Sequence, residues 1–76
     1  MGTWNYRVVR KEEKLAIHEV YYDDNGEINA FTSLPIAPYG EDIEDLGYTL
    51  GFMKRALELP VLDYDELMLI EYRPPD

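Results

Sequence analysis

Apolar and polar residues alternate at every second position over much of the first half of the chain. Residues 4–10 follow this pattern, and residues 15–22 are rich in β-branched and aromatic side chains, so each stretch is expected to form a strand. The charged residues 11–14 separate the two strands as a turn. Asn25-Gly26 favours a tight two-residue hairpin, and residues 27–34 resume the alternation until Pro35, which cannot donate to a sheet. The pattern predicts a three-stranded antiparallel meander.

A helical pattern begins after a loop that is rich in Pro and Gly. Asp42 is the expected N-cap, with Asp45 as a capping-box-like partner, and Pro60 is expected to stop the helix. Apolar residues recur at steps of three and four, and this stripe is expected to cover the sheet: Ile43, Leu46, Leu50, Met53 and Leu57.

The C-terminal segment begins as an acidic turn and becomes apolar. Residues 67–72 favour a fourth strand, with a short helix as the alternative, and residues 73–76 are expected to form an extended tail. The chain is therefore predicted to be a single α+β domain over residues 1–76, of βββα or βββαβ order.

This architecture leaves more apolar surface than one helix and one sheet face can hide. Tyr48, Phe52 and Leu59 lie on a second helix face; either the loop or the C-terminal segment folds over them, or they contact another protein. Both faces of the second strand carry bulky side chains, and we expect a second subunit to cover one of them. The predicted interface therefore comprises Tyr48, Phe52, Leu59, His18, Val20 and Tyr22.

Size and charge narrow the classes of function. A domain of 76 residues has a small core, and with no Cys for disulfides or thiolate metal sites, a homodimer is the expected source of further stability. The net charge of −9 disfavours nucleic acid; it is explained first by solubility, and it would also favour encounter with a basic protein partner. No membrane span or signal peptide is recognisable, so a cytoplasmic location is expected.

Candidate catalytic and metal-binding patterns are incomplete. His18-Glu19 begins like a zincin motif, but the second His is missing; with Gly26 aligned to the EF-hand glycine, Tyr21 and Thr32 occupy the end-ligand positions. His18 faces Ser33 if the second turn has two residues, which is the nearest approach to a nucleophile and base. We expect no enzyme activity, catalytic residue, metal or cofactor, and keep a small His-based or metal-dependent hydrolase as an alternative.

Two resemblances accompany this interpretation. The strand and helix order, with Phe31, Pro35, Gly40 and the run 42–46, resembles the HicB-type antitoxin domain, although the Pro-Gly-Cys-like turn of that type is absent. This resemblance implies a partial ribonuclease-H-like fold and an inhibitor of a basic toxin or nuclease. Residues 4–9 and 16–23 are similar to a family of short bacterial hypothetical proteins, which implies no activity. The leading hypothesis is a non-catalytic, homodimeric interaction module with an acidic surface.

Overall fold

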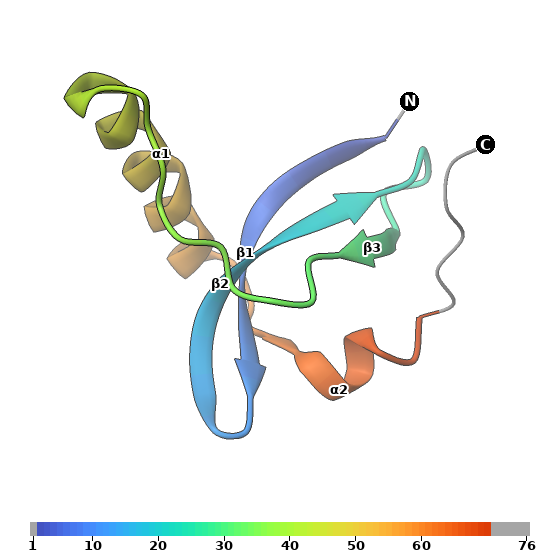
Figure 1. Cartoon of the computed structure of the whole chain (residues 1–76). Helices are drawn as coiled ribbons and strands as arrows, with labels where there is room; N and C mark the ends of the chain where they lie inside the picture. The colour runs from blue at the N-terminus through green and yellow to red at the C-terminus, as the bar shows by residue number, and fades with distance from the viewer. Residues whose placement is uncertain (1, 71–76) are drawn as a thin grey trace.

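The computed structural model describes residues 2–70 and has the α+β architecture expected from the sequence (Figure 1). Three antiparallel strands are followed by a helix, a short fourth strand and a short helix. In chain order the elements are β1 (Thr3–Lys11), β2 (Lys14–Tyr22), β3 (Ile28–Phe31), α1 (Ile43–Arg55), the 3-10 turn η1 (Ala56–Glu58), β4 (Leu62–Asp63) and α2 (Tyr64–Leu67).

β1 and β2 form a long hairpin, on which the other elements pack. They pair in unbroken register from Thr3 opposite Tyr22 to Lys11 opposite Lys14. Glu12 and Glu13 make the two-residue loop with φ of 52° and 67°, the left-handed conformation that a primed hairpin turn requires. Neither residue is a glycine or asparagine, so the long strand pairing, and not the turn chemistry, sets this hairpin.

The turn between β2 and β3 differs from the predicted two-residue hairpin. The Gly26 N–H donates to the Asp23 carbonyl at 3.0 Å, and the Asp23 N–H donates to the Glu27 carbonyl at 2.8 Å. With φ of 80° at Gly26, this is a three-residue loop closed by a glycine bulge. Asn25 needs no positive φ there, because the Asp23 carboxylate accepts its backbone N–H at 2.9 Å and holds the turn.

The four strands lie in the order β3-β2-β1-β4. β4 runs parallel to β1 and pairs only with Val9 and Arg10. The fourth strand therefore exists, but the predicted position was wrong: Leu67 belongs to α2, residues 68–70 are a turn, and residues 71 and 72 lie outside the described part. The Asp63 carboxylate caps α2 by accepting the Asp65 N–H at 2.9 Å, and this local bond starts a helix where a strand was expected.

α1 begins as the sequence predicts. Asp42 is the N-cap and its carboxylate accepts the Asp45 N–H at 2.7 Å, while the Asp45 carboxylate accepts the Glu41 N–H at 3.1 Å. Gly40 lies against the first turn so closely that a Cβ there would overlap the backbone nitrogen of Leu46. The α-helix ends at Arg55 and continues as η1, ahead of Pro60.

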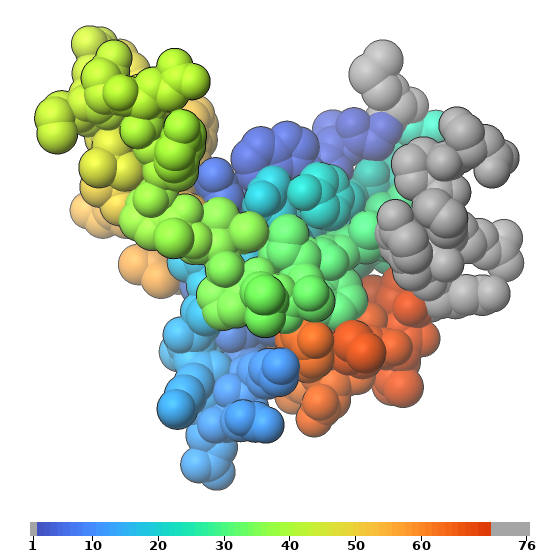
Figure 2. All heavy atoms as spheres, viewed as in Figure 1, coloured from blue at the N-terminus to red at the C-terminus, as the bar shows by residue number. Residues whose placement is uncertain are grey.

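Only part of the predicted apolar stripe of α1 covers the sheet: Met53 is buried and Leu46 half-buried, and the expectation was wrong for the other three residues. Ile43 is 85% exposed, and Leu50 and Leu57 are also exposed. The helix instead packs along a line between its two apolar sides, on which Met53 and Ala56 are buried and Leu46 and Thr49 half-buried. The start of α1 consequently stands out from the body of the molecule (Figure 2).

The two faces of the sheet have different covers. Opposite residues in the β1/β2 register share a face, so Trp4, Tyr6 and Val8 look toward α1 and η1. Val9, His18 and Val20 lie on the other face, where α2 supplies Leu67. The fully buried Val9 and Val20 place the better-packed part of the core on the α2 side.

Candidate interaction surface

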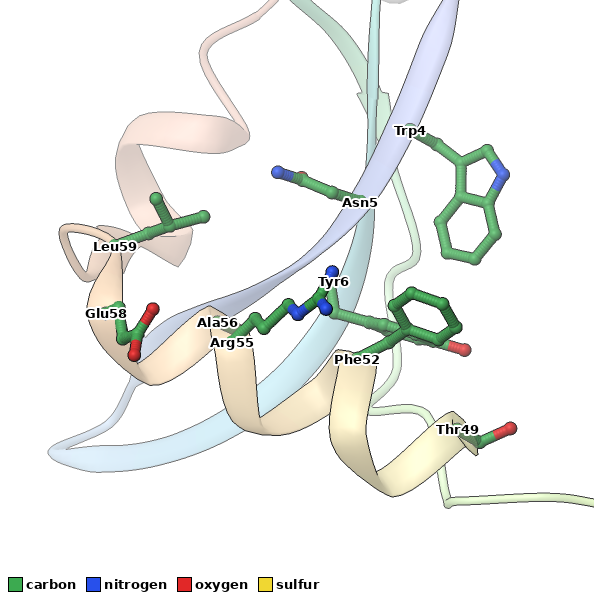
Figure 3. A pocket seen from close by; sticks show the side chains of 9 residues that line it. All are labelled: Trp4, Asn5, Tyr6, Thr49, Phe52, Arg55, Ala56, Glu58 and Leu59. Atoms are coloured by element: carbon green, nitrogen blue, oxygen red, sulfur yellow. The ribbon is translucent and has the colours of Figure 1, made fainter. Parts of the chain in front are cut away.

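A groove with a volume of about 760 Å³ lies between β1 and the helical segment. β1 contributes Trp4, Asn5 and Tyr6, and α1 with η1 contributes the opposite wall: Thr49, Phe52, Arg55, Ala56, Glu58 and Leu59. Trp4 and Thr49 stand at one end and Leu59 at the other, so β1 and α1 run in the same sense along it (Figure 3). We call this hollow the β1–α1 groove.

Aromatic rings line the groove from both walls. Trp4 and Tyr6 meet edge to face, with ring centroids 5.2 Å apart at 87°. Phe52 faces them from α1, and the Arg55 guanidinium lies 5.3 Å from its ring centroid (Figure 3). This cation–π contact holds Arg55 over Phe52, so the groove combines aromatic surface with one fixed positive charge.

The predicted interface residues of the helix remain on the surface. Tyr48 is 62% exposed, Phe52 54% and Leu59 39%. Neither the loop before α1 nor the described C-terminal segment buries them, because the latter passes to the opposite face of the sheet. These three residues form one side of α1 and η1, and Phe52 and Leu59 open into the β1–α1 groove.

An acidic hollow adjoins Tyr48 at the start of α1. It is lined by Glu41, Asp42, Glu44, Asp45 and Tyr48. The Tyr48 hydroxyl donates to the Glu44 carboxylate at 3.4 Å, which joins this acidic end to the aromatic side of the helix. The carboxylates are placed there by the helix itself, because they favour the positive end of its dipole.

The sheet residues expected at the interface have partners within the chain. His18 is 1% exposed and Val20 is fully buried, so neither side chain is available to a second subunit. The His18 Nδ1–H donates to the Thr32 carbonyl at 2.8 Å, and the ring packs near Tyr64 of α2. The face that was assigned to a second subunit is thus covered by the chain's own C-terminal segment.

Tyr22, the third of these sheet residues, is half-buried in a polar network. Its hydroxyl donates to the Asn5 side-chain oxygen at 2.8 Å and accepts from Arg7 Nη1 at 3.0 Å. Arg7 Nη2 also donates to the Pro60 carbonyl at 2.8 Å, where the chain crosses the edge of β1. This network ties the helical half of the chain to the β1/β2 hairpin, which is a structural role.

The candidate catalytic residue His18 and the candidate metal ligand Asp23 both form hydrogen bonds to backbone groups of the chain. His18 is enclosed, and its Nδ1 is occupied by the Thr32 carbonyl, which orients the ring inward. The Asp23 carboxylate accepts hydrogen bonds from the backbone N–H groups of Asn25 and Glu27, at 2.9 and 3.0 Å. Among residues 2–70, no group of three His, Asp or Glu side chains is arranged to share a metal ion.

Glu19 lies between two tyrosines on the α1 side of the sheet. Burial raises the pKa of Tyr6, and the charge of Glu19 raises it further. Burial also raises the pKa of Tyr21, whose hydroxyl donates to the Glu19 carboxylate at 3.1 Å. This cluster borders the groove at Tyr6, so a negative charge stands beside its aromatic wall.

Sequence reasoning missed the contribution of β1 to this surface. Trp4 and Tyr6 were assigned to a strand but to no site, because alternation alone does not say which face a helix covers. Trp4 is the one tryptophan of the sequence and is 51% exposed, which is high for a residue type that is well buried on average. The large aromatic side chain of Trp4, near the start of an expected strand, was the sequence feature that could have indicated this surface.

No protein-family model, curated protein or solved structure matches this chain. In the described part of the chain, no helix is long and apolar enough to cross a membrane.

Proposed function

We propose that this chain is a non-catalytic protein-interaction module that forms a homodimer through the β1–α1 groove and presents an acidic surface to further partners. The observation that carries the proposal is the groove itself, in which exposed Phe52 faces exposed Trp4 and exposed Leu59 lines the other end of the hollow. Contiguous exposed aromatic surface of this kind is typical of protein interfaces.

The size of the domain supports the same proposal. A single core in a domain of this length supplies only about 3–5 kcal/mol of stability, and small domains commonly add oligomerisation. The buried apolar residues of the described part number six, and only Met53 and Ala56 of these come from α1 and η1. Burial of the remaining apolar surface of α1 in a dimer would stabilise a helix that now projects into solvent.

The test is the mass of the particle in solution. Light scattering after size exclusion at about 100 µM is expected to give twice the monomer mass, since a dimer depends on protomer concentration. Phe52→Glu places a charge in the groove and should give a monomer that retains its circular dichroism spectrum. Leu34→Glu is the matched control, because Leu34 is 70% exposed on the loop after β3 and lies outside the groove.

These measurements test separately whether the chain forms a homodimer and whether the β1–α1 groove is its interface. A monomeric wild-type chain at this concentration would remove the homodimer, and a Phe52→Glu variant that stays dimeric would place the interface elsewhere. If Leu34→Glu also dissociates the dimer, charge alone and not the groove would be responsible.

A second candidate function, inhibition of a basic partner such as a toxin or nuclease, is favoured by the acidic hollow at the start of α1. A basic enzyme encoded beside this chain should lose activity when the chain is added in equal amount. Reversal of two carboxylates, Glu44→Lys with Asp45→Lys, should abolish that inhibition, whereas the exposed pair Glu12→Lys with Glu13→Lys should not. Equal inhibition by both variants would exclude the acidic hollow as the contact.

A further inference from the structure

The outer edge of β1 is open along its first half. β4 pairs only with Val9 and Arg10, and within residues 2–70 no other strand lies on this side of β1. The chain crosses the edge at residues 59–61, where the Pro60 carbonyl accepts from Arg7. Residues 3–6 therefore form a short edge that can accept another strand.

The hairpin register shows which backbone groups point outward from this edge. Because Glu12 and Glu13 form a two-residue loop, Lys11 and Lys14 are the hydrogen-bonded pair that closes it. Hydrogen-bonded and non-hydrogen-bonded pairs alternate from there along an antiparallel ladder, so Asn5 bonds to Val20 on β2. The N–H and C=O groups of Trp4 and Tyr6 then point away from β2, toward the open side.

The same two residues supply the aromatic wall of the β1–α1 groove. An added strand would thus find main-chain partners at Trp4 and Tyr6, and apolar surface from Phe52 and Leu59 above it. This combination of a free sheet edge and side-chain pockets is what recognition by strand addition requires.

We infer that the occupant is β1 of a second copy, pairing antiparallel about a two-fold axis at Asn5 so that the two sheets become one. This inference rests on the proposed homodimer and names its mode of pairing. Trp4 would lie opposite Tyr6 of the partner subunit, and Tyr6 opposite Trp4 of the partner subunit. Each pair is hydrogen-bonded through the outward groups, and the four rings share the face covered by α1.

Charge favours β1 as the strand that approaches a second copy. Two chains with a net charge of −9 repel one another, but β1 carries Arg7, Arg10 and Lys11 and no carboxylate. In the antiparallel arrangement the partner strand leaves the groove at the Trp4 end, so the basic residues of the two strands do not face one another.

Asn5→Cys tests this arrangement directly. In the proposed dimer Asn5 lies opposite its own copy as a non-hydrogen-bonded pair, with Cα atoms about 4.5 Å apart, which is within the range of a disulfide. The chain has no other cysteine, so mild oxidation is expected to convert most of the variant to a covalent dimer that reduction reverses. Asn25→Cys, in the exposed β2–β3 turn, is the control and should stay largely uncrosslinked.

Substitutions at Tyr6 test the backbone bonds separately. Tyr6→Ala removes the ring, and Tyr6→Pro removes the ring and also the outward N–H, at a position where the monomer uses no such bond to β2. The proline variant is expected to dimerise more weakly than the alanine variant by roughly tenfold or more, measured by sedimentation.

The outcomes distinguish this inference from the proposed function. A wild-type dimer whose Asn5→Cys variant fails to crosslink, and whose two Tyr6 variants dimerise equally, would overturn edge pairing and leave the homodimer intact. A wild-type monomer at about 100 µM would overturn both the homodimer and the edge pairing.

Discussion

The ring of Tyr64 in α2 meets the ring of Phe31 in β3 edge to face, with 5.6 Å between centroids and 89° between planes. Tyr64 also lies beside His18, and the Lys11 ammonium stands 4.4 Å from its ring centroid. One side chain therefore joins α2 to all three antiparallel strands. Through these contacts the C-terminal segment of the chain itself packs on the face that carries His18 and Val20.

Tyr64→Ala should be among the most destabilising single substitutions in the domain. Loss of a fully buried aromatic ring costs about 3–5 kcal/mol, and the half-buried Tyr64 should lose part of that, which is still a large fraction of the stability expected of a domain this small. Urea unfolding followed by circular dichroism measures the effect. Tyr64→Phe keeps the ring contacts and should remain near wild type, as should Tyr39→Ala at a site 72% exposed. Equal midpoints for Tyr64→Ala and Tyr39→Ala would show that α2 contributes little to the core.

Local chemistry made much of this fold predictable. The alternation over β1 and β2, the positive φ at Gly26 and the Asp42 cap depend on residues near one another in sequence, and all are present. The position of the last strand was not predictable from apolar content, because residues 67–70 suit a strand or a helix equally. The signal that resolves it is Asp63 followed three residues later by Glu66, a helix-start spacing that outweighs the apolar run.

The orientation of α1 could not be predicted for a different reason. Its two apolar sides were recognised, but the line that packs on the sheet runs between them and includes the small or polar residues Thr49 and Ala56. The small side chains of Thr49 and Ala56 let the helix approach the sheet closely, while Leu46 and Met53 supply the apolar contacts of this line. The groove follows from this packing, which brings Phe52 opposite Trp4, and it depends on tertiary structure that periodicity does not contain.

Gly47 and Gly51 are expected to be sites of easy stabilisation. Both lie within α1, and a Cβ at either position would meet no atom within 4 Å. Replacing a helical glycine with alanine restricts the unfolded chain and gains about 1 kcal/mol, which raises Tm by roughly 4–8 °C for a domain of this size. Gly47→Ala measured by thermal unfolding tests this expectation.

Gly40→Ala is the matched control for this prediction. The same substitution should lower Tm there, since the new Cβ would overlap the backbone of Leu46. If Gly40→Ala and Gly47→Ala shift Tm in the same direction, the close approach of the loop to α1 is wrong.

The β1/β2 turn is expected to improve with the residues that primed turns prefer. Glu12 and Glu13 both hold positive φ, which costs a residue with a Cβ about 1 kcal/mol or more. Glu12→Asn with Glu13→Gly relieves that cost and should raise the free energy of unfolding by about 1 kcal/mol. Glu12→Gln with Glu13→Gln removes the same charges without relieving the backbone. A gain as large in this control would show that charge repulsion, and not backbone strain, limits the turn.

Alkaline pH should destabilise the domain through Tyr6 and Tyr21. Their folded pKa values lie above the ordinary value of 10.0, first because of burial and then because of Glu19. Above pH 10 the unfolded chain releases these protons more readily than the folded chain, so stability is constant below that pH with respect to these groups and falls as pH rises through the folded pKa values.

Glu19→Gln tests this prediction because it removes the negative charge but leaves the burial. The pKa of both tyrosines should fall toward 10.0 without reaching it, since burial is the larger cause. Absorbance at the tyrosinate band measures the titration, and unfolding at alkaline pH should show a smaller loss of stability than in wild type. Glu27→Gln, on the exposed β2–β3 turn, should leave the titration of these tyrosines unchanged. An identical alkaline titration in wild type and Glu19→Gln would mean that the carboxylate does not lie between the two rings in solution.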